Sequence, residues 1–167
     1  LGLIGSGTLG NGVARLAEAF GMRVLRAERK GAAVVRPGYT AFADVLAEAD
    51  AISLHCPLTA ETQNLIGEAE LKAMKPSALL INTARGGIVD EAALIRALKE
   101  GWIAGAGLDA YGTEPLPADH PFRTLPNVLP SPHIGYVSQN VYHLFFADIV
   151  DDITAFLDGS PVRVITP

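Results

Sequence analysis

Cysteine is nearly absent from this sequence, because Cys56 is the single one among 167 residues. One cysteine cannot form an internal disulfide, and it leaves no Cys/His cluster with the spacing that zinc requires. Long apolar runs are also missing, since charged residues interrupt every stretch before it reaches the about 20 residues that a bilayer span needs. These absences predict a reducing, cytoplasmic setting, and they argue against a metal centre and a membrane partner.

An excess of charge of one sign is lacking as well. Charged residues make up 19% of the chain and the formal net charge is -5, with acids and bases interleaved. No basic stripe is available to neutralise a phosphate backbone, so nucleic acid is not an expected partner. Hydrophobic residues reach 49%, which is typical of a globular protein of a length suited to one domain.

A leader segment is the last missing feature. The chain begins with LGLIG, an apolar run typical of a buried strand, and no charged segment or signal peptide precedes it. We therefore expect that the natural N-terminus lies upstream of Leu1.

What the chain does contain is an alternation of short apolar runs with helical stretches. The runs predict strands at residues 1–4, 23–27, 51–55, 78–82, 103–108 and 127–129. Helices are expected at residues 9–20, 42–48, 68–74 and 91–100. Alternation of this kind predicts a doubly wound parallel sheet between two helical layers, a three-layer α/β/α fold.

The region between Tyr111 and Pro132 differs from the rest because it is rich in proline, which excludes a helix there. A rigid, irregular loop of that length is usually functional. Residues 137–157 then lack both proline and glycine and carry apolar residues at helical spacing, so they predict one long helix.

The run GSGTLG matches the pattern GxGxxG between an expected strand and an expected helix. Gly5, Gly7 and Gly10 allow a tight turn, a close approach of backbone to a pyrophosphate, and close packing of the helix on the strand. Thr8 and Leu9 open the helix whose N-terminus faces that anion. The pattern predicts dinucleotide binding on a Rossmann-type fold, and the alternative is an ordinary glycine-rich turn.

Glu28 stands at the end of the second expected strand, about 20 residues after the glycine pattern, where an acid binds the ribose hydroxyls of NAD. Arg29 follows directly, and a guanidinium at this position can instead accept the extra phosphate of NADP. A solvated charge pair in a turn is the remaining alternative. We favour NAD over NADP, because the Glu28 carboxylate would repel that phosphate.

Four later segments share their order and spacing with one family. They are HCPLTAETQNLI from His55, INTARGGIVDEAAL from Ile81, GAGLDAYGTEP from Gly105 and PSPHIG from Pro130. Together they closely resemble the D-isomer-specific 2-hydroxyacid dehydrogenases over nearly the whole chain. The resemblance implies an NAD-dependent enzyme that transfers a hydride between the cofactor and a small D-2-hydroxy acid or 2-keto acid.

The resemblance also assigns three catalytic side chains. His133 would be the general acid/base, because imidazole titrates near physiological pH. Glu114 would orient His133, and Arg85 would hold the substrate carboxylate with its planar fork of donors. Considered without the surrounding motifs, His133 is a packed loop residue and Arg85 is a surface arginine in a glycine turn.

Further residues of these segments would line the cofactor, with Asp109 facing the nicotinamide. The set that the resemblance implies, beyond the glycine turn, Glu28 and Arg29, is His55, Pro57, Thr62, Thr83, Ala84, Arg85, Asp109, His133 and Gly135. The sequence departs from the family pattern at Glu28, where aspartate is more usual, at Gly112, where many members have glutamate, and at Tyr136, where a small residue is common. None of these departures removes a catalytic group.

Members of the family generally carry a second, substrate-binding domain, and they usually dimerise through the cofactor domain. We therefore interpret residues 1–137 as a dinucleotide-binding domain, and residues 138–167 as a helix and tail that lead back toward a missing N-terminal substrate domain. A homodimer is expected. Two alternatives stay open: an NAD(H)-sensing binding module like the transcriptional corepressors among the relatives, and a glycine-rich α/β domain that binds no nucleotide.

Overall fold

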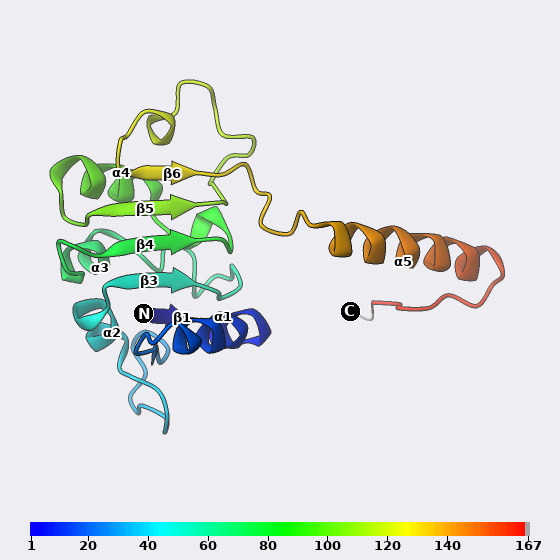
Figure 1. Ribbon diagram of the computed structural model, residues 1–167, viewed down its shortest axis with the longest axis horizontal. Helices are drawn as coiled ribbons and strands as arrows, with labels where there is room; N and C mark the ends of the chain where they lie inside the picture. The colour runs from blue at the N-terminus through cyan, green and yellow to red at the C-terminus, as the bar shows by residue number, and fades with distance from the viewer. Residues whose placement is uncertain (166–167) are drawn as a thin grey trace. The chain divides into compact units, whose positions relative to one another are not determined.

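Six parallel strands lie side by side in the computed structural model, which describes residues 1–165 (Figure 1). Their order across the sheet is β2 (Leu25–Arg26), β1 (Gly2–Ile4), β3 (Ala51–Leu54), β4 (Leu79–Asn82), β5 (Gly105–Leu108) and β6 (Val128–Pro130). The strand order reverses at β1, where Gly2 pairs with Leu25 on one side and with Ile52 on the other. Ligands of open α/β sheets bind at the carboxyl ends of the strands, beside such a reversal.

Helices connect the strands. They are α1 (Thr8–Ala19), α2 (Phe42–Glu48), α3 (Glu68–Ala73) and α4 (Glu91–Glu100), with short 3-10 turns η1 (Gly86–Ile88) and η2 (Pro121–Arg123). From β1 the chain crosses to β2 at one edge of the sheet. It then returns past β1 to β3 and continues strand by strand to β6 at the other edge. Since such crossovers are right-handed, α1 covers one face of the sheet and the mutually contacting α2, α3 and α4 cover the other.

The core lies between the sheet and these helices. Strand side chains such as Leu3, Ile52 and Leu80 are fully buried. Ile52 and Leu80 belong to one apolar cluster with Leu71 of α3 and Leu94 of α4. The strands are apolar on both faces because helices cover both faces, as parallel sheets require. The predicted doubly wound α/β fold is therefore confirmed.

The predicted element bounds agree closely with the structure. Residues 42–48 and 91–100 form helices with the expected limits. The expected strand at 23–27 is reduced to Leu25–Arg26, because it is an edge strand that pairs only with the short β1. The last strand includes Pro130, which an edge position tolerates because no neighbour needs its missing N–H.

Residues Ile134–Pro167 form a second compact unit, separate from Leu1–His133. Its helix α5 (Gln139–Leu157) confirms the long helix expected at 137–157, and the Ser138 hydroxyl caps it by accepting the Val141 N–H at 3.3 Å. The following segment returns to the helix through Arg163, whose Nε donates to Asp152 at 2.8 Å. The expectation that residues 138–167 lead toward a further domain stays a prediction, and residues 166–167 of that tail lie outside the described part.

Over residues 1–165, every helix falls short of the length and apolar character that crossing a bilayer demands.

Candidate functional site

The turn between β1 and α1 is closed tightly by glycine. Gly5 has a φ of 101°, and a Cβ atom there would lie 2.5 Å from the backbone nitrogen of Cys56, at the end of β3. A Cβ on Gly10 would collide with the carbonyl oxygen of Gly5. Gly7, in contrast, faces open space, with no heavy atom within 4 Å of its would-be Cβ. The turn therefore packs against β3 on one side and leaves the other side accessible.

The N-terminus of α1 fits an anionic group. Its cap residue Gly7 supplies no side-chain acceptor, and the first turn contains no acidic residue, so the N–H groups at Thr8 and Leu9 face outward without a capping carboxylate. The buried Ser6 hydroxyl has no hydrogen-bond partner among residues 1–165. A pyrophosphate would meet both the unsatisfied donors and the positive end of the helix dipole.

Glu28 and Arg29 follow the bridge that extends β2, next to the glycine turn. The Glu28 side chain is buried, and Arg36 holds it in an ion pair with a Nε to Oε2 distance of 2.6 Å. The Arg36 side chain, aided by the Arg29 backbone N–H, lowers the pKa of Glu28 to about 2. Glu28 is therefore charged at any physiological pH, and Arg29 is exposed.

The segment after β3 lies beside the glycine turn, since a Cβ on Gly10 would approach the His55 side chain to 3.4 Å. His55 Nε2 lies 2.9 Å from the buried Ser53 hydroxyl, and burial lowers the pKa of His55. The Thr62 hydroxyl donates to the Pro57 carbonyl at 2.6 Å, which folds the loop on itself. His55, Pro57 and Thr62 thus lie after β3, at the same edge of the sheet as the glycine turn.

Asn82, which the sequence analysis missed, positions the segment that carries Arg85. Its side chain is buried at the end of β4, where Nδ2 donates to the Arg85 carbonyl at 2.9 Å and Oδ1 accepts the Ala84 N–H at 3.0 Å. Thr83 and the Arg85 side chain are exposed as a result. The sequence did contain a signal for Asn82, because it is a polar residue inside an otherwise apolar strand. A buried amide needs hydrogen-bond partners of its own.

A close backbone contact joins the Arg85 segment to the loop after β5. A Cβ on Gly86 would collide with the Tyr111 carbonyl group, so the two loops touch at their main chains. Asp109, buried at the start of this loop, donates its N–H to the Asn82 carbonyl at 2.9 Å. Residues predicted from distant motifs thus meet at the carboxyl ends of β4 and β5.

His133 and Glu114 form a direct pair, with His133 Nδ1 lying 2.7 Å from Glu114 Oε2. The other carboxylate oxygen accepts the Tyr111 N–H at 2.9 Å. This N–H, then His133, and more weakly the positive charge of Arg85, hold the pKa of Glu114 below its usual range. His133 has a φ of 58°, a left-handed conformation that non-glycine residues adopt mainly where their surroundings require it.

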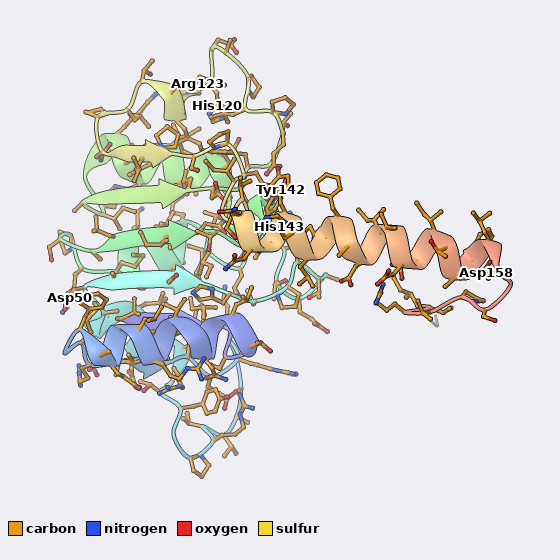
Figure 2. The ribbon with its side chains drawn as sticks, turned by 45° about the vertical axis from the view of Figure 1, so that its right-hand side comes forward. Asp50, His120, Arg123, Tyr142, His143 and Asp158 are labelled. Atoms are coloured by element: carbon orange, nitrogen blue, oxygen red, sulfur yellow. The ribbon has the colours of Figure 1, made fainter. Side chains whose placement is uncertain are left out.

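The Tyr111 hydroxyl fixes the chain on either side of this pair. The sequence patterns did not indicate this role for Tyr111. The hydroxyl contacts the carbonyls of Leu108 and Ser131 at 2.9 Å each and accepts the Ser131 N–H at 3.0 Å. A pocket of about 250 Å³ borders Tyr111, Glu114 and His133. The proline-rich loop is braced by Arg123, which donates to the Leu116 carbonyl at 2.6 Å, and Figure 2 shows Arg123 beside His120 in this connection.

The predicted site residues therefore gather at one edge of the sheet. Arg85, Asp109, Glu114 and His133 follow β4, β5 and β6, while the glycine turn, Glu28 and the segment from His55 follow β1, β2 and β3. Asp50, which precedes β3, marks the opposite edge in Figure 2. Gly135 and Tyr136 belong to the second compact unit, not to the unit that carries this edge.

No group of three or more histidine, cysteine or acidic side chains suited to a metal ion is present in the described part of the chain. The arrangement instead combines an anion-binding helix terminus, an exposed guanidinium and a histidine–carboxylate pair. These groups can hold a dinucleotide, hold a carboxylate and move a proton.

Known proteins resemble this chain over nearly its whole length. Residues 1–135 match the family described as "D-isomer specific 2-hydroxyacid dehydrogenase, NAD binding domain". A glycerate dehydrogenase from Methylorubrum extorquens is 44% identical over 168 residues, which cover 99% of this chain and 52% of that protein. The chain thus spans about half the length of this curated relative.

Solved structures show the same fold. The NAD-complexed D-isomer specific 2-hydroxyacid dehydrogenase of Lactobacillus delbrueckii ssp. bulgaricus superposes with a TM-score of 0.82 at 37% identity, over 99% of this chain and 55% of that one. A D-isomer specific 2-hydroxyacid dehydrogenase of Xanthobacter autotrophicus Py2, in complex with NADPH and MES, gives 0.76 at 34% identity, over 98% and 68%. The solved relatives therefore include one in complex with NAD and one in complex with NADPH.

Proposed function

Because this chain belongs to the D-isomer specific 2-hydroxyacid dehydrogenase family, we propose that it transfers a hydride between NAD(H) and a small D-2-hydroxy acid or 2-keto acid. The observation that carries the proposal is the contact of 2.7 Å between His133 and Glu114, beside the segment that presents Arg85. A histidine oriented by a carboxylate is the arrangement that proton transfer to a substrate oxygen needs.

His133 is the proposed general acid/base. Its Nδ1 faces Glu114, so Nε2 is the ring nitrogen that exchanges a proton with the substrate. In reduction, Nε2 donates a proton to the keto oxygen while the keto carbon accepts a hydride, and in oxidation His133 takes the hydroxyl proton. The nicotinamide, when bound, supplies or accepts that hydride.

Arg85 is the proposed substrate-binding residue. Its guanidinium is exposed at the carboxyl end of β4, and its backbone is held by Asn82. A planar guanidinium can hold a carboxylate through two parallel hydrogen bonds, and it polarises the neighbouring keto group at the same time.

The proposed cofactor site extends along the same edge. The glycine turn and the N-terminus of α1 would hold the pyrophosphate, because their unsatisfied donors and the buried Ser6 hydroxyl lack partners among the described residues. Glu28 and Arg29 lie where the adenosine ribose would rest. The remaining proposed contacts come from His55, Pro57, Thr62, Thr83, Ala84, Arg85, Asp109, His133 and Gly135.

The decisive experiment replaces the acid/base. We expect His133→Gln in the intact protein to lower kcat for keto-acid reduction by about 10²- to 10⁴-fold, the usual contribution of a positioned acid/base. The NADH dissociation constant should stay near the wild-type value. Unchanged turnover would refute the role of His133, and equal loss of turnover and NADH affinity would point to a damaged fold instead.

A substrate panel separates the enzyme from the binding-module alternative. Glyoxylate, hydroxypyruvate, pyruvate and 3-phosphohydroxypyruvate should be offered to the intact protein with NADH and with NADPH. Turnover on none of them, with NADH binding intact, would favour an NAD(H)-sensing module. We further propose a cytoplasmic homodimer, and we expect residues 1–167 alone to bind NADH but turn over slowly, since an open site does not exclude water.

A further inference from the structure

All acceptor positions of the Glu28 carboxylate are taken. Oε1 accepts the Arg29 backbone N–H at 2.9 Å and Arg36 Nη2 at 2.8 Å. Oε2 accepts the Arg36 backbone N–H at 3.2 Å and Arg36 Nε at 2.6 Å. A carboxylate offers about four lone-pair positions, and the Glu28 side chain is only 5% exposed. While Arg36 holds it, Glu28 has no acceptor left for ribose hydroxyls.

Arg36 is itself held in place by a tight turn. The Tyr39 N–H donates to the Arg36 carbonyl at 3.0 Å across Pro37 and Gly38, and the φ of 81° at Gly38 fits the third position of a type II turn. The Arg36 guanidinium also lies 4.0 Å from the centre of the Tyr39 ring. Its side chain nevertheless remains 56% exposed, so a fixed guanidinium reaches the surface beside Glu28.

The charges around this point favour an anion. Arg36 neutralises Glu28, and Lys30 is paired with Glu70 at 2.9 Å. Arg29 is exposed and forms no salt bridge within residues 1–165. Together Glu28, Arg29 and Arg36 therefore carry a net positive charge, although Glu28 considered alone predicts repulsion of a phosphate.

We propose that Arg36 is the specificity-determining residue at the adenosine end of the site, and that it lets the protein bind the 2′-phosphate of NADP(H) as well as NAD(H). Glu28 is then a positioning residue that holds Arg36, and Arg29 supplies a second cation. The inference rests on the proposed function, because it places the cofactor along the glycine turn next to Glu28.

Dissociation constants of NADH and NADPH, measured by calorimetry on the intact protein, test this assignment. Wild type should bind the two cofactors within about tenfold of each other. In Arg36→Met the freed Glu28 carboxylate should repel the 2′-phosphate, so the NADPH dissociation constant rises at least about tenfold while that of NADH changes by less than about threefold.

Arg23→Met is the matched control. It removes the same charge and breaks a similar pair, Arg23 with Glu48 at 2.7 Å, before the amino end of β2, so both affinities should persist. An unchanged NADPH to NADH ratio in Arg36→Met overturns the inference. Failure of wild type to bind NADH overturns the proposed function together with the inference.

Discussion

Tyr111 is a single residue on which both halves of the histidine–carboxylate pair depend. Its hydroxyl ties the end of β5 to Ser131, two residues before His133, while its backbone N–H holds Glu114. Tyrosine hydroxyls that are buried almost always find partners, and this one has three contacts. Its contribution is thus to fix the spacing between two proposed catalytic groups from different loops.

Removing this hydroxyl should weaken the fold measurably. We expect Tyr111→Phe to lower the free energy of unfolding by about 1–3 kcal/mol, because it leaves backbone groups of the buried Leu108 and the half-buried Ser131 with fewer partners. Chemical denaturation gives the number. Tyr142→Phe, at an exposed position of α5, is the control and should change stability by less than about 0.5 kcal/mol. Equal effects in both variants would contradict the assigned role.

The sequence predicts the proposed catalytic residues but not the residues that position them. His133, Glu114 and Arg85 lie in motifs whose order is readable along the chain. Asn82 and Arg36 act through side-chain hydrogen bonds to groups that only the folded chain brings within reach. Glu28 and Arg36 stand eight positions apart, and only the folded loop between them brings the guanidinium onto the carboxylate.

At the scale of elements, α4 connects the core to the loop that carries Glu114. Its inner face buries Leu94 and Leu98 against the sheet. Its first residue, Glu91, accepts the Gly112 N–H at 3.2 Å and contacts His120 at 3.0 Å, both in the segment after β5. A helix that begins one residue later or frays at its start would therefore release the loop that carries Glu114.

The N-cap of α4 is the point at which this can be tested. The Asp90 side chain accepts the Ala93 N–H at 3.0 Å, so we expect Asp90→Ala to cost about 0.5–2 kcal/mol of unfolding free energy. Thermal and denaturant unfolding both report it. Asp119→Ala, in the exposed loop, serves as the reference and should be close to neutral. A variant as stable as wild type would show that the cap is dispensable.

Element bounds could be predicted well because they depend on local signals. Asp90 before α4 and Gly101 after it mark both ends of that helix in the sequence, and the structure uses both. The extent of β2 depends instead on its neighbour, since β1 offers only three residues for pairing. Strand length at a sheet edge is therefore a tertiary property.

At the scale of the whole molecule, paired carboxylates link stability to pH. Folding lowers the pKa of Glu28 from its usual 4.5 to about 2, mainly through Arg36, and it also lowers the pKa values of Asp50, Glu68 and Glu114. A depressed pKa in the folded state contributes stability above the unfolded pKa, and that contribution is lost as pH falls through the folded value.

We therefore expect the free energy of unfolding to decline as pH falls from 4.5 toward about 2. Urea denaturation at a series of pH values measures this. Glu28→Gln should show a shallower decline than wild type, because one of the titrating groups is gone. Stability that increases on acidification in this window would contradict the linkage.

The contact between Gly86 and the Tyr111 main chain has a consequence for how this protein can vary. No side chain fits at position 86, because even a methyl group would collide with the carbonyl of Tyr111. Neighbouring positions can change during sequence drift, but this one admits glycine alone. The arginine on one loop and the glutamate on the next are consequently held on two main chains in direct contact, and a saturation library at position 86 should return one residue.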